Sequence, residues 1–462
     1  MKKDYDVVIV GAGAAGVFLA YELLTINNKI KVLMIEKGNS IGNRKCPVKD
    51  NRTKVCVKCN NNTICDVTNG WIGAGAFSDG KYNITNEFGG ELHNFVGNQE
   101  AIDLMNYVDE INCKLGGKGA KLYSTANSGL KTQALRHDLH LLDAQVRHLG
   151  TDRNLIIAEN MFEFLKDKID IIFKTEVIDV VKQNNKFMVK TINQNFECDK
   201  LVLATGRSGS KWISTVCKGL GIKTESNRVD IGVRVELPAA IFEHITKDVY
   251  ESKIVYRTKK YNDLVRTFCM NPYGEVVTEN TNGIITVNGH SYSNPELHTN
   301  NTNFALLVSN RFTEPFKNSN EYGESIARLS NMLGGGVIVQ RFGDLVSGRR
   351  TNLRRMAKSF TKGTLDATSG DLSLVIPKRQ LDDIIEMIYQ LDKIAPGTAN
   401  EDTLLYGVEV KFYNSKVEVD NNLETKIKGL YVLGDCSGVT HSLSQAAASG
   451  IHVARVLNKA YN

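Results

Sequence analysis

A glycine-rich segment near the start of the chain constrains the fold more than any other feature. Residues 6–10 form a short apolar run typical of a buried parallel strand, and Gly11-Ala-Gly-Ala-Ala-Gly16 follows at once. Helix-forming residues continue from Val17, and a second apolar run ends in Glu36, 20 residues after Gly16. This order of strand, glycine motif, helix and acidic strand end predicts a dinucleotide-binding βαβ unit, in which the carboxylate accepts hydrogen bonds from a ribose hydroxyl.

Each small residue of this motif has a physical role in holding a nucleotide. Gly11 permits the tight turn after the strand, Gly13 lets the backbone approach a pyrophosphate, and Gly16 lets the helix and strand pack closely. The first helical turn, at Ala14 and Ala15, presents N–H groups and a partial positive charge, which favour phosphate. The βαβ unit is therefore expected to bind a dinucleotide.

Two distant segments end apolar runs in a similar way. Leu203-Ala-Thr-Gly206 ends one in mid-chain, and Leu430-Tyr-Val-Leu-Gly-Asp435 ends another further along. With the N-terminal motif they resemble the three dispersed signatures of the two-dinucleotide-binding-domain flavoproteins, the glutathione-reductase-like superfamily. The resemblance implies that the bound dinucleotide is FAD. The sequence shows no second strand–GxGxxG–helix unit, so we expect no separate NAD(P)H domain.

The resemblance assigns cofactor contacts to individual positions. Asp435 would hydrogen-bond the ribityl chain, and Arg44, shortly after the second strand, would contact the pyrophosphate. Thr205 and Gly206 would pass near the adenosine half, and the backbone at Val177 would touch adenine. The expected cofactor-binding set is completed by Lys37, Gly75, Phe77, Gly434, Ser444, Gln445 and Ala446.

The helix expected after Asp435 supports the same interpretation. It begins in the small-residue segment Ser442-Leu-Ser-Gln-Ala-Ala-Ala-Ser-Gly450, and small side chains let a helix lie close to a flat ring. By the resemblance its N-terminus would point at the flavin pyrimidine. A partial positive charge there stabilises the anionic reduced flavin.

A more specific resemblance covers nearly the whole chain. Residues 73–81, 229–236 and 287–292 look like segments of a family of bacterial FAD-dependent dehydrogenases, as do residues 405–411 and 434–450. The resemblance implies that the segment containing Gly75 and Phe77 runs beside the flavin. The sequence departs from the expected pattern at Cys436 and His441, where a small residue and a longer basic residue would be expected. Flavin contacts carried over to these two positions are therefore in question.

Four of the nine cysteines fall within one short segment. Cys46, Cys56, Cys59 and Cys65 lie between the acidic strand end and residue 73, in a region without clear periodicity. Four thiols so close together suit a zinc ion or an iron–sulfur cluster, which would feed single electrons to FAD. The spacing matches no standard zinc-finger or ferredoxin run, and a redox pair at Cys56 and Cys59, or no special role, are the alternatives.

Three residues are candidates for acid–base chemistry on a substrate. His290 and Tyr292 follow an alternating strand, and His441 lies near the flavin by its position in the motif. A buried, hydrogen-bonded structural role is the alternative for each. Arg349, Arg350, Arg354 and Arg355 form a local basic patch, which either binds a carboxylate or phosphate or is a solvated face.

Composition and charge limit the partners. The chain has 462 residues and a net charge of +6, with no long basic run, so nucleic acid is not the expected partner. The N-terminal apolar stretch is interrupted by glycines and by Glu22, so it reads as neither a signal peptide nor a membrane span. We therefore expect a cytoplasmic protein that acts on a small molecule, without membrane attachment.

These features predict an α/β fold, in which a Rossmann-like FAD domain is assembled from discontinuous segments around an inserted mixed α+β substrate domain. The expected FAD segments are 1–95, with the cysteine-rich loop at 42–70, 130–226 and 402–462, and the expected insertion is 227–401. The predicted activity is hydride transfer between flavin and an organic substrate. Electrons would come from transient NAD(P)H or a redox protein. The alternatives are an electron-transfer flavoprotein and a flavin-dependent RNA-modifying enzyme.

Overall fold

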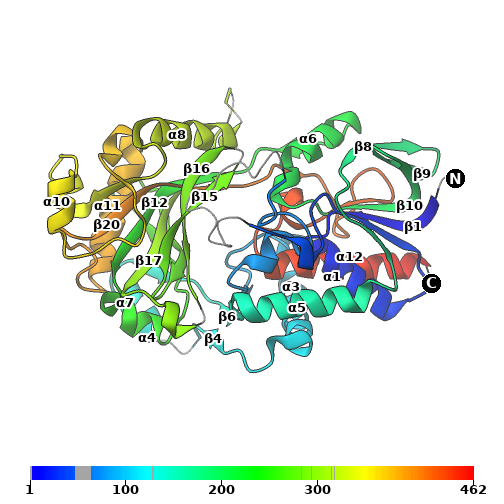
Figure 1. Cartoon of the computed structure of the whole chain (residues 1–462), viewed down its shortest axis with the longest axis horizontal. Helices are drawn as coiled ribbons and strands as arrows, with labels where there is room; N and C mark the ends of the chain where they lie inside the picture. Colours follow the sequence, from blue (N-terminus) through cyan, green and yellow to red (C-terminus); the bar gives the residue numbers. More distant parts are fainter. Residues whose placement is uncertain are drawn as a thin grey trace. The chain divides into compact units, whose positions relative to one another are not determined.

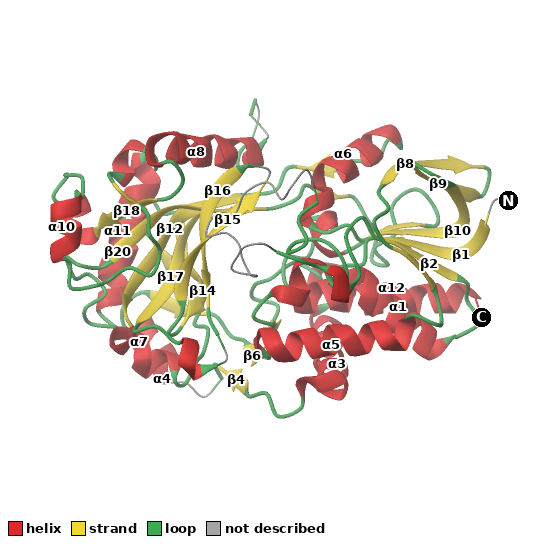
Figure 2. Ribbon diagram, in the orientation of Figure 1, coloured by secondary structure: helices red, strands yellow, loops and turns green. Residues whose placement is uncertain are grey.

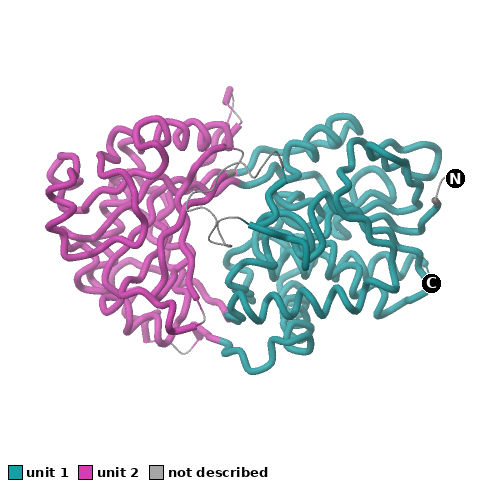
Figure 3. The backbone as a smooth tube through the Cα atoms, viewed as in Figure 1, with its two compact units in different colours: residues 1–122, 147–227, 413–462 teal, residues 123–146, 228–412 magenta. Residues whose placement is uncertain are grey.

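The chain folds into two compact units, shown in Figures 1 and 3. The computed structural model describes residues 3–46, 64–126, 129–281, 283–292, 294–313, 315–316 and 318–461. Unit 1 contains Met1–Leu122, Arg147–Asn227 and Tyr413–Asn462, and unit 2 contains Tyr123–Val146 and Arg228–Phe412. Three separate stretches of sequence therefore build unit 1.

Unit 1 is built on a seven-stranded sheet. Its strands are β1 (Lys3–Val10), β2 (Val32–Ile35), β7 (Asp170–Ile172), β8 (Val177–Gln183), β9 (Lys186–Thr191), β10 (Asn195–Leu203) and β22 (Leu430–Val432). The order is β7-β2-β1-β10-β9-β8, with β22 also beside β10. The strands β7, β2, β1, β10 and β22 run parallel, and β8 and β9 form an antiparallel extension.

Helices cover this sheet, as Figure 2 shows. They are α1 (Ala14–Ile26), α2 (His93–Val96), α3 (Asn98–Asn112), α5 (Gly150–Leu165), α6 (Ser210–Gly219) and α12 (Leu443–Tyr461). Shorter strands are β3 (Lys81–Ile84), β11 (Thr224–Glu225) and β21 (Lys416–Val417), and the boundaries between the two units fall within β4 (Leu122–Ser124) and β6 (Gln145–His148). Val7 and Ile9 pack in the core that contains α1 and α12, whereas Val8 and Val10 pack in a second core that contains α6. Because both faces of β1 are buried over Val7–Val10, this half of the strand is apolar without alternation.

Unit 2 is built on an eight-stranded sheet in the order β19-β18-β20-β12-β17-β14-β13-β5. These strands are β5 (Leu139–Leu141), β12 (Val229–Pro238), β13 (Ile254–Arg257), β14 (Leu264–Asn271), β17 (Asn301–Asn310), β18 (Ile338–Arg341), β19 (Thr368–Ser369) and β20 (Leu404–Phe412). A separate hairpin is formed by β15 (Glu275–Thr281) and β16 (Ile284–His290). The helices are α4 (Gly129–Leu135), α7 (Ala239–Thr246), α8 (Ser319–Gly334), α9 (Phe342–Val346), α10 (Leu353–Lys358) and α11 (Lys378–Asp392).

The central strand β12 has one apolar and one charged face, and both are buried. Ile231, Val233 and their odd-numbered neighbours pack in the core with α11. On the other face, Arg234 is fully buried and forms a bidentate ion pair with Glu409 of β20, with both N···O distances 2.7 Å. A buried pair of this kind is stable only while both partners are present.

The predicted α/β fold is confirmed. The sequence predicts helices over 99–115, 320–333 and 378–394, where the structure has α3, α8 and α11. The sequence also predicts a helix over 133–166, which is wrong in its first half, because the short strands β5 and β6 precede α5. Residues 123–146 pack with unit 2, although the sequence placed 130–226 in one segment. None of the described helices has the length and apolar character needed to cross a membrane.

Candidate functional site

The signature segments of the sequence follow the carboxyl ends of adjacent parallel strands. In the sheet register Val10 pairs with both Ile35 and Leu203, and Leu203 pairs with Val432. The amide of Ala204 donates to the Val10 carbonyl at 2.8 Å, so the chain segments leaving β1 and β10 stay side by side. In open α/β sheets, ligands bind in the crevice outside the carboxyl ends of the strands.

The three glycines in the first turn have different surroundings. Gly11 has φ +104°, and a Cβ there would lie 2.5 Å from the Ala204 carbonyl oxygen. A Cβ at Gly16 would lie 2.2 Å from the Gly11 carbonyl oxygen, so Gly16 is needed for α1 to pack on β1. Gly13 has φ −72°, and a Cβ there would meet nothing closer than Ala204 at 3.7 Å. Protein packing does not require glycine at Gly13, which leaves this backbone open to a bound group.

The N-terminus of α1 is left without a side-chain cap. Gly13 at the N-cap makes no side-chain hydrogen bond, and the first turn contains no acidic residue. Ala14 and Ala15 in this turn are buried. An uncapped, buried N-terminus behind an open glycine backbone fits a pyrophosphate, because the first N–H groups of a helix have no partner within it.

The Glu36 carboxylate organises the turn beside this N-terminus. It is 6% exposed and accepts hydrogen bonds from the backbone N–H groups of Ala12 and Gly38, both at 2.8 Å, and of Gly70 at 3.0 Å. A carboxylate has about four acceptor positions, so three donors leave one for a ribose hydroxyl. Glu36 therefore joins the first turn to Gly70, which lies 34 residues after Glu36 in the sequence. One acceptor position of its carboxylate remains for the predicted ribose contact.

Arg44, the side chain predicted to contact the pyrophosphate, instead donates its hydrogen bonds to backbone carbonyls of the protein. Its guanidinium donates to the carbonyls of Asp66 at 2.7 Å, Trp71 at 2.6 Å, Val67 at 2.8 Å and Gly73 at 2.9 Å. Burial lowers the pKa of Arg44 to about 10, and the carboxylate of Glu36 opposes that shift. The observed role of Arg44 is to hold the loop over residues 66–73 in place.

This loop crosses the helix N-termini and places two predicted cofactor residues. Ile72 lies in the left-handed region at φ +61° and bridges to Gly13. The Gly75 carbonyl accepts from the Asn154 side chain at 2.5 Å, and a Cβ at Gly75 would lie 2.9 Å from Leu443 at the start of α12. Left-handed backbone at a β-branched residue is strained, and such strain concentrates at functional sites. Sequence reasoning missed Asn154, because no local pattern marks its contact with Gly75.

Phe77 and Lys37 lie at the edges of the same region. The guanidinium of Arg44 lies 4.5 Å from the Phe77 ring centroid. Phe77 therefore contacts the same side chain that holds the loop over residues 66–73. Lys37 is half-buried, directly after Glu36.

The N-terminus of α12 contains buried polar groups without partners. The hydroxyls of Ser444 and Thr440 are 0% exposed and have no hydrogen-bond partner among the described residues. Ala446 follows in the same buried turn. Orphaned buried hydroxyls are costly, and a bound group with polar ring atoms would satisfy them. Ser444 was predicted from the sequence, whereas Thr440 was missed.

The amide of Gln445 binds the protein backbone. Its Nε2 donates to the carbonyls of Thr85 and Phe88, both at 3.2 Å, and its Oε1 accepts from the Leu92 amide at 3.3 Å. Gln445 therefore ties the segment from Thr85 to Leu92 to α12. It shapes the surroundings of the predicted flavin contact.

The turn after β22 brings Asp435 to the same end of the sheet. Gly434 has φ +70°, and a Cβ there would lie 2.9 Å from the Cβ of Ala15. The Asp435 carboxylate is half-buried, 3.3 Å from Arg207, and its backbone carbonyl accepts from the Asn414 side chain at 2.7 Å. Burial raises the pKa of the Asp435 carboxyl, and Arg207 opposes the shift. Sequence reasoning missed Arg207 and Asn414, because no local pattern marks their contacts with Asp435.

The remaining predicted cofactor positions also lie near these strand ends. Thr205 and Gly206 lie two and three residues after the end of β10, with Gly206 at φ +61°. Before β8, the amide of Thr175 donates to the Glu36 carbonyl at 3.0 Å, which places the start of that strand, Val177, beside the end of β2.

Comparison with known proteins agrees with this geometry. Residues 5–235, half of the chain, match the family model described as pyridine nucleotide-disulphide oxidoreductase. The chain belongs to the pyridine nucleotide-disulphide oxidoreductase family. Residues 228–412 match a second model, described as FAD-dependent protein, C-terminal domain-like. The protein is an FAD-dependent oxidoreductase, and the predicted flavoprotein family is confirmed.

Individual relatives are distant. An uncharacterized protein of Clostridium beijerinckii is 27% identical over 475 residues, which cover 97% of this chain and 79% of the relative. Glycine oxidase from Geobacillus kaustophilus aligns with 12% identity and a TM-score of 0.40, over 99% of this chain and 95% of its own. L-proline dehydrogenase from P. horikoshii aligns with 12% identity and a TM-score of 0.41, over 100% and 95%. Scores this low carry no argument about function.

The predicted acid–base residues of the oxidoreductase fall into two groups. His441 lies in unit 1, where its ring packs edge-on against Tyr413 at 4.7 Å. His290 and Tyr292 lie in unit 2, with ring centroids 4.8 Å apart. The Tyr292 hydroxyl donates to Glu275 at 2.6 Å, and burial, together with that carboxylate, raises the pKa of Tyr292 to about 12.

The structure describes only the two ends of the cysteine segment. Cys56 and Cys59 lie outside the described residues, and Cys46 and Cys65 are free thiols. The Lys45 amide donates to the Asp66 carboxylate at 3.2 Å, so the flanking residues Cys46 and Cys65 lie near one another. Among the residues that the structure describes, no three His, Cys, Asp or Glu side chains form a metal-binding group.

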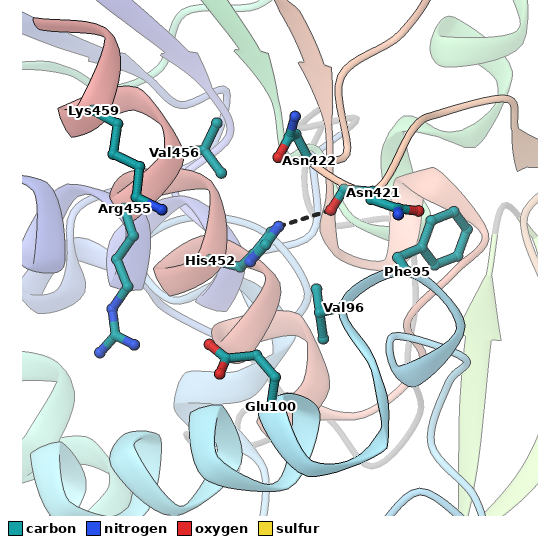
Figure 4. Close-up of a pocket in the computed structure, with 9 residues that line it drawn as sticks. All are labelled: Phe95, Val96, Glu100, Asn421, Asn422, His452, Arg455, Val456 and Lys459. Carbon is teal, nitrogen blue, oxygen red and sulfur yellow. Dashed lines mark hydrogen bonds between the residues drawn. The ribbon is translucent and has the colours of Figure 1, made fainter.

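A pocket of about 350 Å³ lies on the C-terminal half of α12, away from the strand ends (Figure 4). His452 lines it and shares a hydrogen bond of 2.9 Å with the Asn421 carbonyl. Burial lowers the pKa of His452. Eight residues of helix, about 12 Å, separate His452 from Ser444, so this pocket is distinct from the candidate cofactor site.

Proposed function

We propose that this FAD-dependent oxidoreductase transfers hydride between its flavin and a small organic substrate, reducing an activated C=C bond or oxidising the saturated form. The observation that carries the proposal is the grouping of open backbone and orphaned polar atoms in unit 1. Gly13 leaves the α1 N-terminus accessible, and the Ser444 hydroxyl at the start of α12 lacks a partner among the described residues. Both features suit the two ends of one extended dinucleotide.

The chain's own groups would bind and orient the cofactor. FAD supplies the hydride chemistry when bound. The α1 N-terminus would hold the pyrophosphate, Glu36 would hold the ribose, and Asp435 would accept from the ribityl hydroxyls. The N-terminus of α12 would favour negative charge on the flavin pyrimidine. Arg44 would act indirectly, through the loop that it binds.

His290, Tyr292 and His441 are the candidates for proton transfer to a substrate. The pKa of Tyr292, raised to about 12, keeps its hydroxyl protonated at neutral pH, and its single O–H is donated to Glu275, so a substrate would have to displace Glu275 to receive that proton. Glu275 fixes the position of that hydroxyl, and His290 lies edge-on against the ring. His441 is the candidate that belongs to unit 1, which also contains the proposed cofactor site.

The second candidate function is electron transfer to or from a redox partner through a cysteine-ligated iron–sulfur cluster. It is favoured by the attachment of the cysteine segment to the cofactor region, since Arg44 and Lys45 both bind Asp66, next to Cys65. In the first candidate function, transient NAD(P)H or a redox protein would supply the electrons.

An anaerobic absorption spectrum of freshly purified protein tests these proposals. A flavin double band alone, bleached by a hydride donor and restored by an oxidised substrate, is expected for hydride transfer. Additional broad absorption, with iron and sulfide in the sample, would favour the second candidate. Failure to bind FAD after reconstitution would refute both proposals.

A further inference from the structure

A strongly basic surface of unit 2 is not used by the proposed chemistry. Residues 345–365 contain six basic residues and no Asp or Glu. They lie on and around α10, drawn in yellow at the periphery of unit 2 in Figure 1. We call this surface the basic crest, and its members are Arg349, Arg350, Leu353, Arg354, Arg355, Lys358, Phe360 and Lys362.

Buried polar anchors hold the basic crest in shape. The fully buried Asp344 accepts from Arg349 and from the Thr351 hydroxyl, both at 2.8 Å. The Asn352 side chain caps α10 by accepting from the Arg355 amide at 3.0 Å, and Asp402 accepts from the Phe360 amide at 3.0 Å. The backbone of the crest is therefore fixed before any partner arrives, which lowers the entropic cost of binding.

The outward side chains combine two kinds of chemistry. Leu353 and Phe360 are each 80% exposed. In the part of the chain that the structure describes, no carboxylate pairs with Arg350, Arg354 or Lys358. Two large apolar side chains thus stand in water among unpaired cations. A basic face that is only solvated would not need them.

We propose that the basic crest docks this protein peripherally on the surface of an anionic phospholipid membrane. Headgroup phosphates would pair with the cations, while Leu353 and Phe360 would enter the acyl boundary, as apolar residues do in interfacial segments. Such docking needs no spanning helix, so it is compatible with the described helices. RNA would also pair with the cations but would leave Leu353 in water, so the membrane is the better match.

Vesicle co-sedimentation of the FAD-loaded protein tests the proposal. We expect binding to vesicles containing phosphatidylglycerol, no binding to phosphatidylcholine alone, and release by salt. The triple variant Arg350→Gln, Arg354→Gln and Lys358→Gln should bind about 100-fold more weakly, at about fivefold per cation. The double variant Leu353→Ser and Phe360→Ser should lose about tenfold.

A matched control removes three exposed cations from unit 1, with Lys211→Gln, Lys218→Gln and Lys223→Gln. It should bind vesicles nearly as well as the natural protein. The absorbance of bound FAD should be unchanged in every variant whose fold is intact. A loss of vesicle binding can therefore be told apart from a failure of the proposed flavin function.

The proposal is overturned if phosphatidylglycerol vesicles do not bind the protein, or if the serine variant binds them as well as the natural protein does. It is also overturned if RNA displaces the protein and the serine variant binds RNA normally.

Discussion

Replacing Gly13 by alanine should separate cofactor binding from folding. The added Cβ would lie 3.7 Å from the Ala204 carbonyl oxygen, an ordinary contact, and the backbone at φ −72° suits alanine. Exchange of glycine for alanine at an N-cap changes stability by about 1 kcal/mol or less. The apoprotein of Gly13→Ala should therefore unfold within a few degrees of the natural apoprotein.

FAD binding should respond much more strongly. The methyl group would occupy the space through which the pyrophosphate approaches the first turn of α1. Losing one hydrogen bond to a charged group costs about 1.5–3 kcal/mol, which corresponds to about 10- to 100-fold weaker binding of FAD. Titration of the apoprotein with FAD, followed by quenching of flavin fluorescence, measures this change.

Gly16→Ala is the matched control, because it adds the same atom three residues further along. Its Cβ would lie 2.2 Å from the Gly11 carbonyl oxygen and 3.1 Å from the Ile9 side chain. Overpacking costs about 1–3 kcal/mol, so this variant should lose both stability and FAD affinity. The reasoning is refuted if Gly13→Ala binds FAD normally, or if its apoprotein is destabilised as much as that of Gly16→Ala.

Three further changes test other parts of the structure. Ser444→Ala removes a buried hydroxyl that has no partner among the described residues, so it should weaken FAD binding about two- to tenfold without lowering the melting temperature of the apoprotein. Arg234→Met removes the bidentate partner of the buried Glu409 carboxylate and leaves it with the weaker contact to Lys411 at 3.8 Å, so it should cost about 3 kcal/mol in urea unfolding, whereas adding Glu409→Leu should recover most of that loss. Burial beside Asp263 raises the pKa of Asp383 to about 7, above its unfolded value, so the stability it contributes is complete below about pH 4 and is lost as the pH rises through about 7. Asp383→Asn should therefore melt higher than the natural protein at pH 8 and lose that advantage at low pH, and equal melting temperatures at both pH values would contradict this.

The parts of the site that could be predicted are those fixed by a few neighbouring residues. The turn at Gly11 needs a positive φ and a close approach to Ala204, so its glycine spacing is visible in the sequence. The family resemblance then linked this turn to Asp435. The helices predicted over 320–333 and 378–394 correspond to α8 and α11.

The parts that could not be predicted depend on contacts distant in sequence. The strand β5 has three residues and is defined by its pairing with β13, which lies more than 100 residues away, so nothing local distinguishes it from helix. Arg44 was expected to meet a phosphate, but four carbonyls of a later loop reach its guanidinium. Gln445 was likewise expected to contact the cofactor, but its side-chain amide binds the backbone of Thr85 and Leu92, some 350 residues earlier in the sequence.

The discontinuous construction of unit 1 sets an order on its folding during synthesis. A Cβ at Gly450 would lie 2.2 Å from the Ala15 carbonyl oxygen, so α12 packs closely on α1. Yet α12 leaves the ribosome only after the whole of unit 2. The apolar surface of α1 that α12 covers therefore stays exposed during the synthesis of unit 2, which is already able to fold. Until this late helix arrives, the nascent chain exposes the apolar surface of α1 to chaperones and to aggregation.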